Sequence, residues 1–302
     1  MSNKIIITGG TGFLGSELIK DLIAQNYNCV VFTRNPSKYQ NTESVEYVEW
    51  IPESNYLAKH ISGAKAIINL AGAPIAGKRW TKSYKKEIID SRVETTKALI
   101  EAVNQCSNKP QKFLSSSASG YFGDRGDEIL TDESEPGKNF LAEVCIKWEQ
   151  ATESLSKNVD LIIFRTGIVL DPDNGALEQL LKPIKMYLGG SLGTGNQYFP
   201  WIHVADWKRF LIFALSNNGL GQKNNLCAPN PVTNNVLTKT IGKVYNRPTM
   251  FKVPAIVLRI VLGEAASMIL DSTRMEPKNI QEANFKFEYE LIEEAIINLK
   301  KV

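Results

Sequence analysis

Residues 8–15 read Thr8-Gly9-Gly10-Thr11-Gly12-Phe13-Leu14-Gly15 and follow directly on the apolar run Lys4–Thr8. After them, apolar residues recur every three or four positions as far as Ile23, which is the spacing of an amphipathic helix. Glycines let the backbone turn tightly and approach a diphosphate, and a helix N-terminus offers free N–H groups and a partial positive charge. Strand, glycine turn and helix in this order predict a dinucleotide site. We expect it to be formed by Gly9, Thr11, Gly12, Phe13, Leu14 and Gly15.

The rest of the first half repeats the alternation of short apolar runs with helical patterns. Candidate strands cover residues 4–8, 28–33, 45–49, 66–70, 111–115 and 160–165, and candidate helices cover 14–23, 88–103 and 139–156. Strands that alternate with helices predict an α/β fold, a doubly wound parallel sheet of the Rossmann type.

A stretch rich in glycine, 189–195, breaks this rhythm before helical patterning resumes near Asp206. We therefore expect a cofactor domain at 1–165, to which a segment of about 201–230 returns. Residues 166–200 and 231–302 are expected to form a smaller C-terminal α/β lobe that holds the substrate.

Composition narrows the classes of function. The chain has 302 residues, 43% hydrophobic and 22% charged, as is usual for globular proteins, and its net charge is only +3. The charges are scattered, which argues against a nucleic-acid partner. Four cysteines stand far apart and only two histidines are present, so neither a metal site nor a disulfide framework is indicated.

Two apolar stretches bear on the compartment. The run after Met1 is too short for a signal peptide. The longest stretch, Val253–Leu270, is interrupted by Arg259, Gly263 and Glu264, which predicts a helix docked on the protein and no membrane span. Together with the isolated cysteines, these features predict a cytoplasmic protein.

The end of the second candidate strand indicates which cofactor is bound. Proteins that take NAD usually carry Asp or Glu there to bind the ribose hydroxyls, whereas this chain has Arg34, with Lys38 close behind. A guanidinium suits a 2′-phosphate, so NADP(H) is predicted in preference to NAD(H). The alternative is that Arg34 is a solvated surface residue.

The fourth strand runs into small residues, Ala71 and Gly72, which leave room for the cofactor at the sheet's carboxyl edge. The following residues, 72–79, nearly spell a phosphate-binding P-loop, but Arg79 stands where Ser or Thr must hold Mg²⁺, so that motif is rejected. Lys78, Arg79 and Trp80 are expected to form a loop at the mouth of the site that contacts an anionic substrate. A simple solvated loop explains them equally well.

The fifth strand delivers FLSSSASGYFG at 113–123. Together with the glycine turn, NLAG at 69–72 and WIHVAD at 201–206, this segment resembles the extended short-chain dehydrogenases/reductases of the NAD-dependent epimerase/dehydratase superfamily. More narrowly, GKRW at 77–80, FLAEVCIKWE at 140–149 and the tail at 248–287 resemble the bacterial "epimerase family" oxidoreductases, which carry a C-terminal domain of unknown function.

The resemblance implies a catalytic serine and a Tyr-x-x-x-Lys pair. Ser117 matches the serine, and Ser116 beside it is expected to contact the cofactor. The pair is missing, because the expected positions hold Leu141 and Cys145. Tyr121 is the nearest phenol and is taken as the substitute acid.

Each candidate for that acid has a structural alternative. The alternative for Tyr121 is that its ring only packs beneath the nicotinamide. Lys147 and His203 are two further candidates for the acid. Their alternatives are a solvated residue on a helix for Lys147 and a buried histidine for His203.

The resemblance further implies a small, anionic, nucleotide-sugar-like substrate, around which we place Arg79, Trp80 and Trp201. The run 189–193 fits the G-x-S-x-G pattern of hydrolases, but no helix start follows it, so a substrate loop is expected there. A second hypothesis is a non-catalytic NADP(H)-binding redox sensor, favoured by the missing Tyr/Lys pair. Relatives often pair the helices corresponding to 83–105 and 139–156 across a two-fold axis, so a homodimer is an expectation that the sequence permits.

Overall fold

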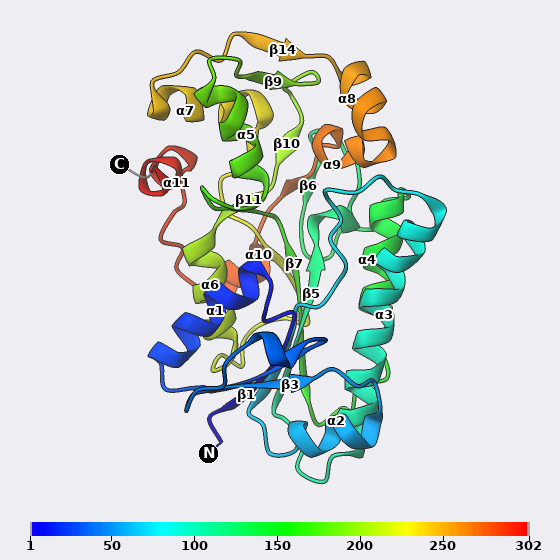
Figure 1. The fold of residues 1–302 in the computed structure, drawn as a ribbon. Helices are drawn as coiled ribbons and strands as arrows, with labels where there is room; N and C mark the ends of the chain where they lie inside the picture. Colours follow the sequence, from blue (N-terminus) through cyan, green and yellow to red (C-terminus); the bar gives the residue numbers. More distant parts are fainter. Residues whose placement is uncertain (1, 301–302) are drawn as a thin grey trace.

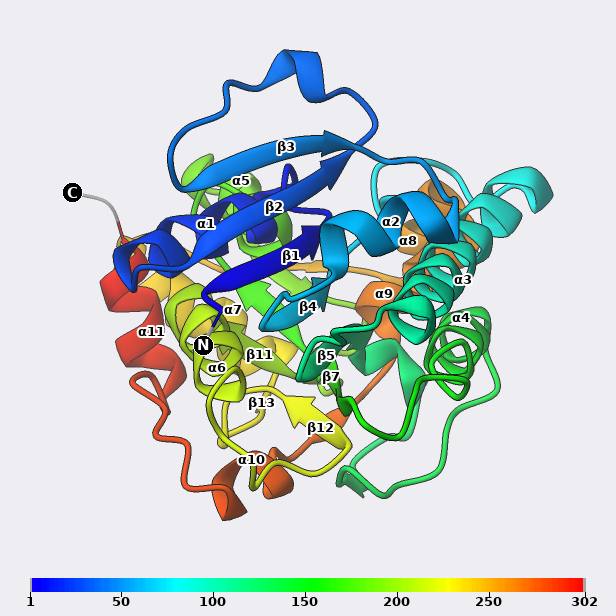
Figure 2. The ribbon, with the colours of Figure 1, turned by 90° about the horizontal axis from the view of Figure 1, so that it is seen from below.

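The structure, a computed structural model, describes residues 2–300. Strand β1 (Lys4–Thr8) is an interior strand of a seven-stranded parallel sheet of order β3-β2-β1-β4-β5-β7-β12 (Figures 1 and 2). Side chains alternate along β1, so that Ile5 and Ile7 join the core on one face of the sheet and Ile6 joins the core on the other. The predicted doubly wound parallel sheet is confirmed.

All six predicted strands are confirmed within three residues at each end. Besides β1, these are β2 (Asn28–Thr33), β3 (Val45–Glu49), β4 (Ala66–Asn69), β5 (Lys112–Ala118) and β7 (Asp160–Thr166). The seventh strand of the sheet, β12 (Lys223–Leu226), was not predicted. Strand β12 comes from the segment 201–230 and pairs in parallel with β7, at the edge of the sheet. Strand order reverses beside β1, since β2 lies on one side of it and β4 on the other. Such a switch point is where open α/β sheets bind their ligands.

Helices cover both faces of the sheet (Figure 2). On one face lie α1 (Phe13–Ala24) and α6 (Val204–Ala214), which contact each other. On the other lie α2 (Ser54–Ile61), α3 (Lys82–Gln105) and α4 (Phe140–Gln150). Helix α4 ends six residues before the predicted limit, and α3 begins earlier than predicted because Thr81 caps it, accepting a hydrogen bond from the backbone N–H of Tyr84.

Helix α1 can start where it does only because position 15 has no side chain. A Cβ at Gly15 would lie 2.4 Å from the carbonyl oxygen of Gly9, and Gly9 itself has φ +71°. The glycines thus bring the helix N-terminus directly over the turn.

The smaller lobe lies at the top of Figure 1. Its core is formed by α5 (Gly175–Lys185), α7 (Asn234–Tyr245), α11 (Ile292–Leu299) and residues of β8 (Ile168–Leu170) and β11 (Trp201–His203). The predicted last helix, 290–301, is α11, and Lys301 lies outside the described residues. The lobe also contains β9 (Gly190–Leu192), β10 (Tyr198–Phe199), β13 (Val232–Thr233), β14 (Phe251–Val253), α8 (Ala255–Leu262) and α9 (Ser267–Leu270).

Part of the segment 231–302 lies away from this lobe. Strand β15 (Arg274–Met275) pairs with β6 (Ile129–Leu130), and α10 (Lys278–Glu282) packs on β12. Phe285 and Phe287 then join the core on the α1 and α6 face of the central sheet. Residues 274–287 therefore belong to the cofactor domain and not, as expected, to the smaller lobe.

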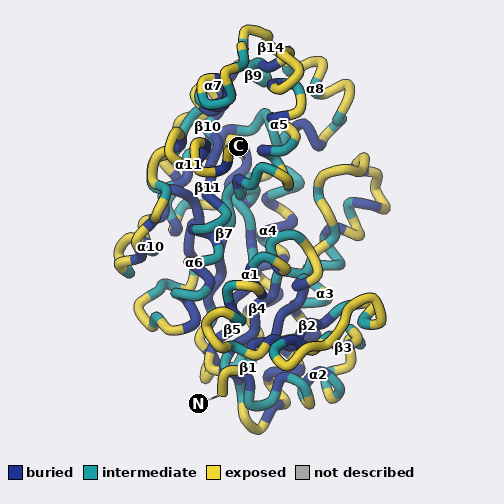
Figure 3. The backbone as a smooth tube through the Cα atoms, turned by 60° about the vertical axis from the view of Figure 1, so that its left-hand side comes forward, coloured by how far each residue is buried: buried dark blue, intermediate teal, exposed yellow. Residues whose placement is uncertain are grey.

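The apolar stretch 253–270 also differs from expectation. Gly263, with φ +62°, ends α8 and divides the stretch into short helices. Apolar side chains of α8 are exposed, Ile256 by 67% and Ile260 by 74%, and Figure 3 shows this helix mostly in the colour of exposed residues. No residue of α8 is buried, so the predicted docking is wrong for this helix. The end of the stretch does pack on the protein, since Ala265 and Ala266 are buried and Met268 contacts the same core cluster as Ala265. Among residues 2–300, no helix is both long enough and apolar enough to cross a membrane.

Candidate functional site

The glycine turn and the start of α1 form a cradle that suits a dinucleotide diphosphate. Thr11 and Gly12 are exposed, Gly12 is the N-cap of α1, and no side chain caps the helix there. The first N–H groups of α1 therefore remain available to an anion. The open space at Gly12, where a Cβ would meet only the Gly9 oxygen at 3.3 Å, leaves room for the ligand.

Arg34 stands just past the end of β2, at the same edge of the sheet. Its side chain is exposed and makes no hydrogen bond or ion pair with any other residue of the described chain, 2–300. A guanidinium in this place is free to receive a phosphate on the adenosine ribose. The cradle residues and Arg34 together fit a bound NADP(H).

A cavity of about 380 Å³ opens beside this cradle, at the carboxyl ends of β4, β5 and β7. Its floor is the end of β5, residues 116–120, and its walls come from α3, α4 and the C-terminal lobe. The lining residues that carry polar side chains are Arg92, Ser116, Ser117, Ser119, Asn139, Cys145, Trp148, Thr166, Tyr198, Ser267, Asp271 and Thr273. Ser116 and Ser117 thus lie in the cavity, as do Leu141 and Cys145, the positions of the missing Tyr/Lys pair.

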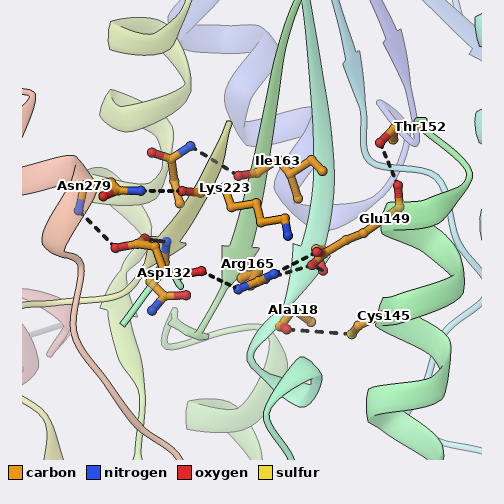
Figure 4. A network of polar contacts seen from close by, with 12 residues as sticks. Ala118, Asp132, Cys145, Glu149, Thr152, Ile163, Arg165, Lys223 and Asn279 are labelled. Atoms are coloured by element: carbon orange, nitrogen blue, oxygen red, sulfur yellow. Dashed lines mark hydrogen bonds and ion pairs between the residues drawn. The ribbon is translucent and has the colours of Figure 1, made fainter. Parts of the chain in front are cut away.

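Ser117 belongs to a buried polar network behind the cavity. Its hydroxyl donates to Oε1 of Glu149 over 2.7 Å, and the same carboxylate accepts two hydrogen bonds from Arg165, each 2.8 Å long. Figure 4 shows this ion pair bridging α4 and β7. Arg165 also donates to the backbone oxygen of Asp132 over 2.9 Å. Both charges are buried and mutually neutralised, so the hydroxyl of Ser117 is held in one orientation at the cavity wall.

Tyr121 lies on the far side of this network. Its ring is 3.5 Å from the Arg165 guanidinium carbon and packs at 5.1 Å from Phe122 in a small apolar cluster. It is 9% exposed and is not among the residues that line the cavity. Burial raises the pKa of its phenol, although the charge of Arg165 opposes the effect. In this structure Tyr121 packs on Arg165 and does not reach the cavity.

The three predicted substrate residues are not brought together. Trp201 is fully buried in the smaller lobe, where its indole N–H donates to the backbone oxygen of Asn230, so packing and not substrate contact explains it. Trp80 is 8% exposed and does not line the cavity. Its indole N–H donates to the backbone oxygen of Ile75, a cavity residue, so Trp80 stabilises the loop that follows β4. Arg79 is exposed on that loop and does not line the cavity.

The other candidates also lie away from the cavity. His203 is buried, stacks on Tyr289 at 3.9 Å, and its Nδ1 accepts the backbone N–H of Ala205 at the start of α6. Burial lowers its pKa, which favours the neutral ring. Lys147 is a surface residue paired with Glu143 at 2.6 Å. The expected substrate loop at 189–193 instead contains β9, which pairs in parallel with β14.

Sequence reasoning missed three ionisable residues that do line the cavity. Tyr198 and Asp271 come from the C-terminal lobe, and Arg92 comes from α3. No motif includes Tyr198 or Asp271. Both residues are far along the chain from β4 and β5, and only the folding of the C-terminal lobe brings them to the cavity. Arg92 stood inside a predicted helix, and only its burial, at 7% exposed, separates it from a surface arginine.

Asp271 has unusual electrostatics. Burial raises the pKa of its carboxyl to about 6, and the nearby charge of Asp124 adds to the effect. Asn139, which also caps α4, donates to Oδ2 of Asp271 over 2.7 Å and so fixes the carboxyl at the cavity wall. A carboxyl with this pKa can hold or release a proton near neutral pH.

Comparisons with known proteins agree with this geometry. The sequence profile of the "NAD dependent epimerase/dehydratase family" matches residues 5–227, and that of a "Domain of unknown function (DUF1731)" matches residues 253–299. The chain is 34% identical to the chloroplastic "Epimerase family protein SDR39U1 homolog" of Arabidopsis thaliana, covering 97% of this chain and 85% of that protein.

Two solved structures are similar over nearly the whole chain. The human epimerase family protein SDR39U1, crystallised with NADPH, superposes with a TM-score of 0.89 at 26% identity, covering 98% of each chain. A nucleoside-diphosphate sugar epimerase of Corynebacterium glutamicum superposes with a TM-score of 0.76 at 30% identity, covering 98% of this chain and 57% of that one.

The buried ion pair leads to a prediction about stability. In Glu149→Gln the charge of Arg165 stays buried without a counter-charge, so the free energy of unfolding should fall by about 3–5 kcal/mol. Glu143→Gln on the same helix removes an exposed pair and should cost about 1 kcal/mol or less. Urea unfolding of both variants checks this, and an equal loss in the two would contradict the role given to Glu149.

Asp271 leads to a prediction about pH. A carboxyl whose pKa is higher in the fold than in the unfolded chain stabilises the fold below the unfolded value, and that contribution is lost as pH rises through about 6. Asp271→Asn should therefore raise the melting temperature relative to wild type at pH 7.5, and the gain should shrink towards pH 4.

The control for this series is Asp90→Asn, which removes a half-exposed carboxylate on α3 that does not line the cavity. It should show no gain that grows with pH. A melting-temperature difference for Asp271→Asn that stays constant from pH 4 to 7.5 would contradict the raised pKa.

Proposed function

Because the chain belongs to the NAD dependent epimerase/dehydratase family, we propose that it is an NADP(H)-dependent oxidoreductase acting on a carbonyl or secondary alcohol of a small anionic metabolite. The observation that carries this proposal is the cavity of about 380 Å³ beside the cofactor cradle. An enzyme needs such a space for its substrate, whereas a redox sensor has no need to keep it clear. The open cavity therefore favours the enzyme over the sensor.

The preference for NADP(H) rests on Arg34. Its guanidinium is exposed and unpartnered within residues 2–300, at the strand end where a ribose 2′-substituent would lie. The human relative that is crystallised with NADPH supports the same cofactor. An arginine gives no comparable interaction with the two neutral hydroxyls of NAD(H).

Bound NADP(H) would supply or accept the hydride. Ser117, which the family resemblance makes catalytic, lies at the cavity wall, and its donation to Glu149 leaves its oxygen lone pairs available to a substrate hydroxyl. Ser116, beside it, is exposed to the same space. For the proton we propose Asp271, because its pKa of about 6 suits acid–base work near neutral pH and Tyr121 lies outside the cavity.

The substrate class follows from size and family. The cavity, which also has to admit the nicotinamide ring, leaves space for a small molecule such as a sugar. The similarity to the nucleoside-diphosphate sugar epimerase of Corynebacterium glutamicum supports a nucleotide-sugar-like compound. Of the three predicted substrate residues, Arg79 alone is exposed, and it could contact the anionic part of such a molecule at the cavity mouth.

We also propose a homodimer through α3 and α4 and a cytoplasmic location. The two helices lie side by side with their outer faces uncovered (Figure 2), and these faces carry ion pairs such as Lys147–Glu143. All four cysteines are free and buried, which suits a reducing compartment.

The test of the function is transfer of label. The protein is incubated at pH 7 with a small-metabolite extract and NADPH deuterated at the transferable position, and the products are analysed by mass spectrometry. We expect a metabolite that gains one deuterium. Asp271→Asn should slow its formation about 100-fold or more, since a general acid is lost.

Glu264→Gln is the matched control, because it removes a carboxylate exposed by 52% outside the cavity, and it should transfer label at the wild-type rate. NADPH that binds without any transfer of label would end the proposal of net reduction. It would leave a sensor, or a redox-neutral enzyme that returns the hydride to its origin.

Arg34→Ala should weaken NADPH binding about 10-fold or more while leaving NADH binding within about twofold, since only the 2′-phosphate loses a charged hydrogen bond. Isothermal titration calorimetry with both nucleotides measures the ratio. Lys59→Ala, which removes the same charge from the exposed face of α2, should leave both affinities unchanged. An unaltered ratio in Arg34→Ala would refute the assigned role.

A further inference from the structure

Helix α4 contributes no charge to the cavity. At the position where the superfamily resemblance implies lysine, Cys145 is buried, and its Sγ lies 3.7 Å from the backbone oxygen of Ala118. Burial raises the pKa of this thiol to about 11, so the thiol stays neutral. Leu141, at the tyrosine position, is apolar. The proton transfer and the positive charge that the Tyr/Lys pair would supply therefore have to come from a helix, strand or loop other than α4.

Helix α3 brings a cation to the same wall. Arg92 lines the cavity, is 7% exposed, and its guanidinium carbon lies 5.1 Å from the ring centre of Trp148, one turn from Cys145 along α4. The Trp148 indole N–H donates to Thr96 Oγ1 over 3.1 Å, and that hydroxyl donates to the backbone oxygen of Arg92 over 2.8 Å. Thr96 thereby fixes the ring of Trp148 relative to the backbone of Arg92, so the guanidinium packs on a ring whose position is fixed.

The guanidinium is left largely unsatisfied. It makes one hydrogen bond within residues 2–300, from a terminal nitrogen to the backbone oxygen of Ile88 over 2.9 Å, and its buried Nε has no partner. It forms no ion pair among the described residues, unlike Arg165, whose charge is neutralised by Glu149. Burial lowers the pKa of Arg92. A buried cation without acceptors is costly, which indicates that a ligand supplies them.

The glycine at the end of β4 makes room for this side chain. A Cβ at Gly72 would lie 2.8 Å from the guanidinium carbon of Arg92. Gly72 itself is exposed at the carboxyl edge of the sheet, between the cradle at β1 and the cavity at β5. A dinucleotide held by its adenosine half over β1 and β2 must pass this point for its other half to enter the cavity.

We propose that Arg92 binds the nicotinamide-ribose half of NADP(H), supplying from α3 the cation that the superfamily places on α4. The ribose hydroxyls and the adjoining phosphate are the acceptors that its free N–H groups lack. Arg92 is thus a positioning residue for the nicotinamide ring beside Ser117. This inference rests on the NADP(H) binding proposed above.

The test compares two ligands in a binding assay that needs no substrate. NADPH carries both halves, whereas adenosine 2′,5′-bisphosphate carries only the half that Arg34 and the cradle hold. For Arg92→Met, calorimetry should show NADPH binding about 10-fold or more weaker and bisphosphate binding changed by no more than about twofold. Lys97→Met, which removes an exposed cation from the same helix, α3, outside the cavity, should change neither.

Folding of the variant is checked by its melting temperature, which should equal or exceed that of the wild type without ligand, because an uncompensated buried charge has been removed. NADPH affinity that does not change in Arg92→Met overturns the inference. An equal loss of affinity for both ligands also overturns it, because Arg92 would then act only on the structure of the glycine turn that holds the adenosine half. A wild type that binds neither ligand refutes the proposed function itself, and this inference with it.

Discussion

The buried ion pair between Glu149 and Arg165 is the interaction on which the site depends. It joins α4 to β7, fixes the hydroxyl of Ser117, and provides the surface on which Tyr121 packs. Burial alone would lower the pKa of Arg165, but its hydrogen bonds to Glu149 and the charge of that carboxylate together raise it, so Arg165 remains charged. Arg165 also donates to the backbone oxygen of Asp132. The ion pair therefore fixes the relative positions of β5 at the cavity floor, helix α4 and the loop after β6.

The sequence predicted best those parts of the fold that are determined by a short run of neighbouring residues. The apolar runs predicted the six strands, since strands buried on both faces need continuous apolar residues. The glycine turn predicted the start of α1, because the close approach at Gly15 excludes any side chain. The apolar pattern at the start of the stretch 253–270 predicted burial, whereas most side chains of α8 are exposed.

The site was harder to predict for a related reason. Trp80 and Trp201 were placed around the substrate that the family resemblance implies, but tryptophan serves the core equally well, and both are buried. Arg92 and Asp271 reach the cavity through contacts between distant segments, which no local pattern records. The missing Tyr/Lys pair was visible in the sequence, whereas its replacement could be recognised only from burial and unsatisfied hydrogen bonds. The charged groups that line the cavity thus come from α3 and the C-terminal lobe, and none comes from α4.

The return of residues 274–287 to the central sheet has a consequence for synthesis on the ribosome. Asn279 donates from its side chain to the backbone oxygen of Lys223 on the edge strand β12, and its backbone N–H donates to Asp132. Until residue 279 has left the exit tunnel, β12 lacks this cover, although every strand of the sheet has already been made. Uncovered edge strands are templates for pairing with other chains. The nascent chain thus depends on residues 274–287 to cover this edge of the sheet, and premature release before residue 279 would leave β12 open to association with other chains.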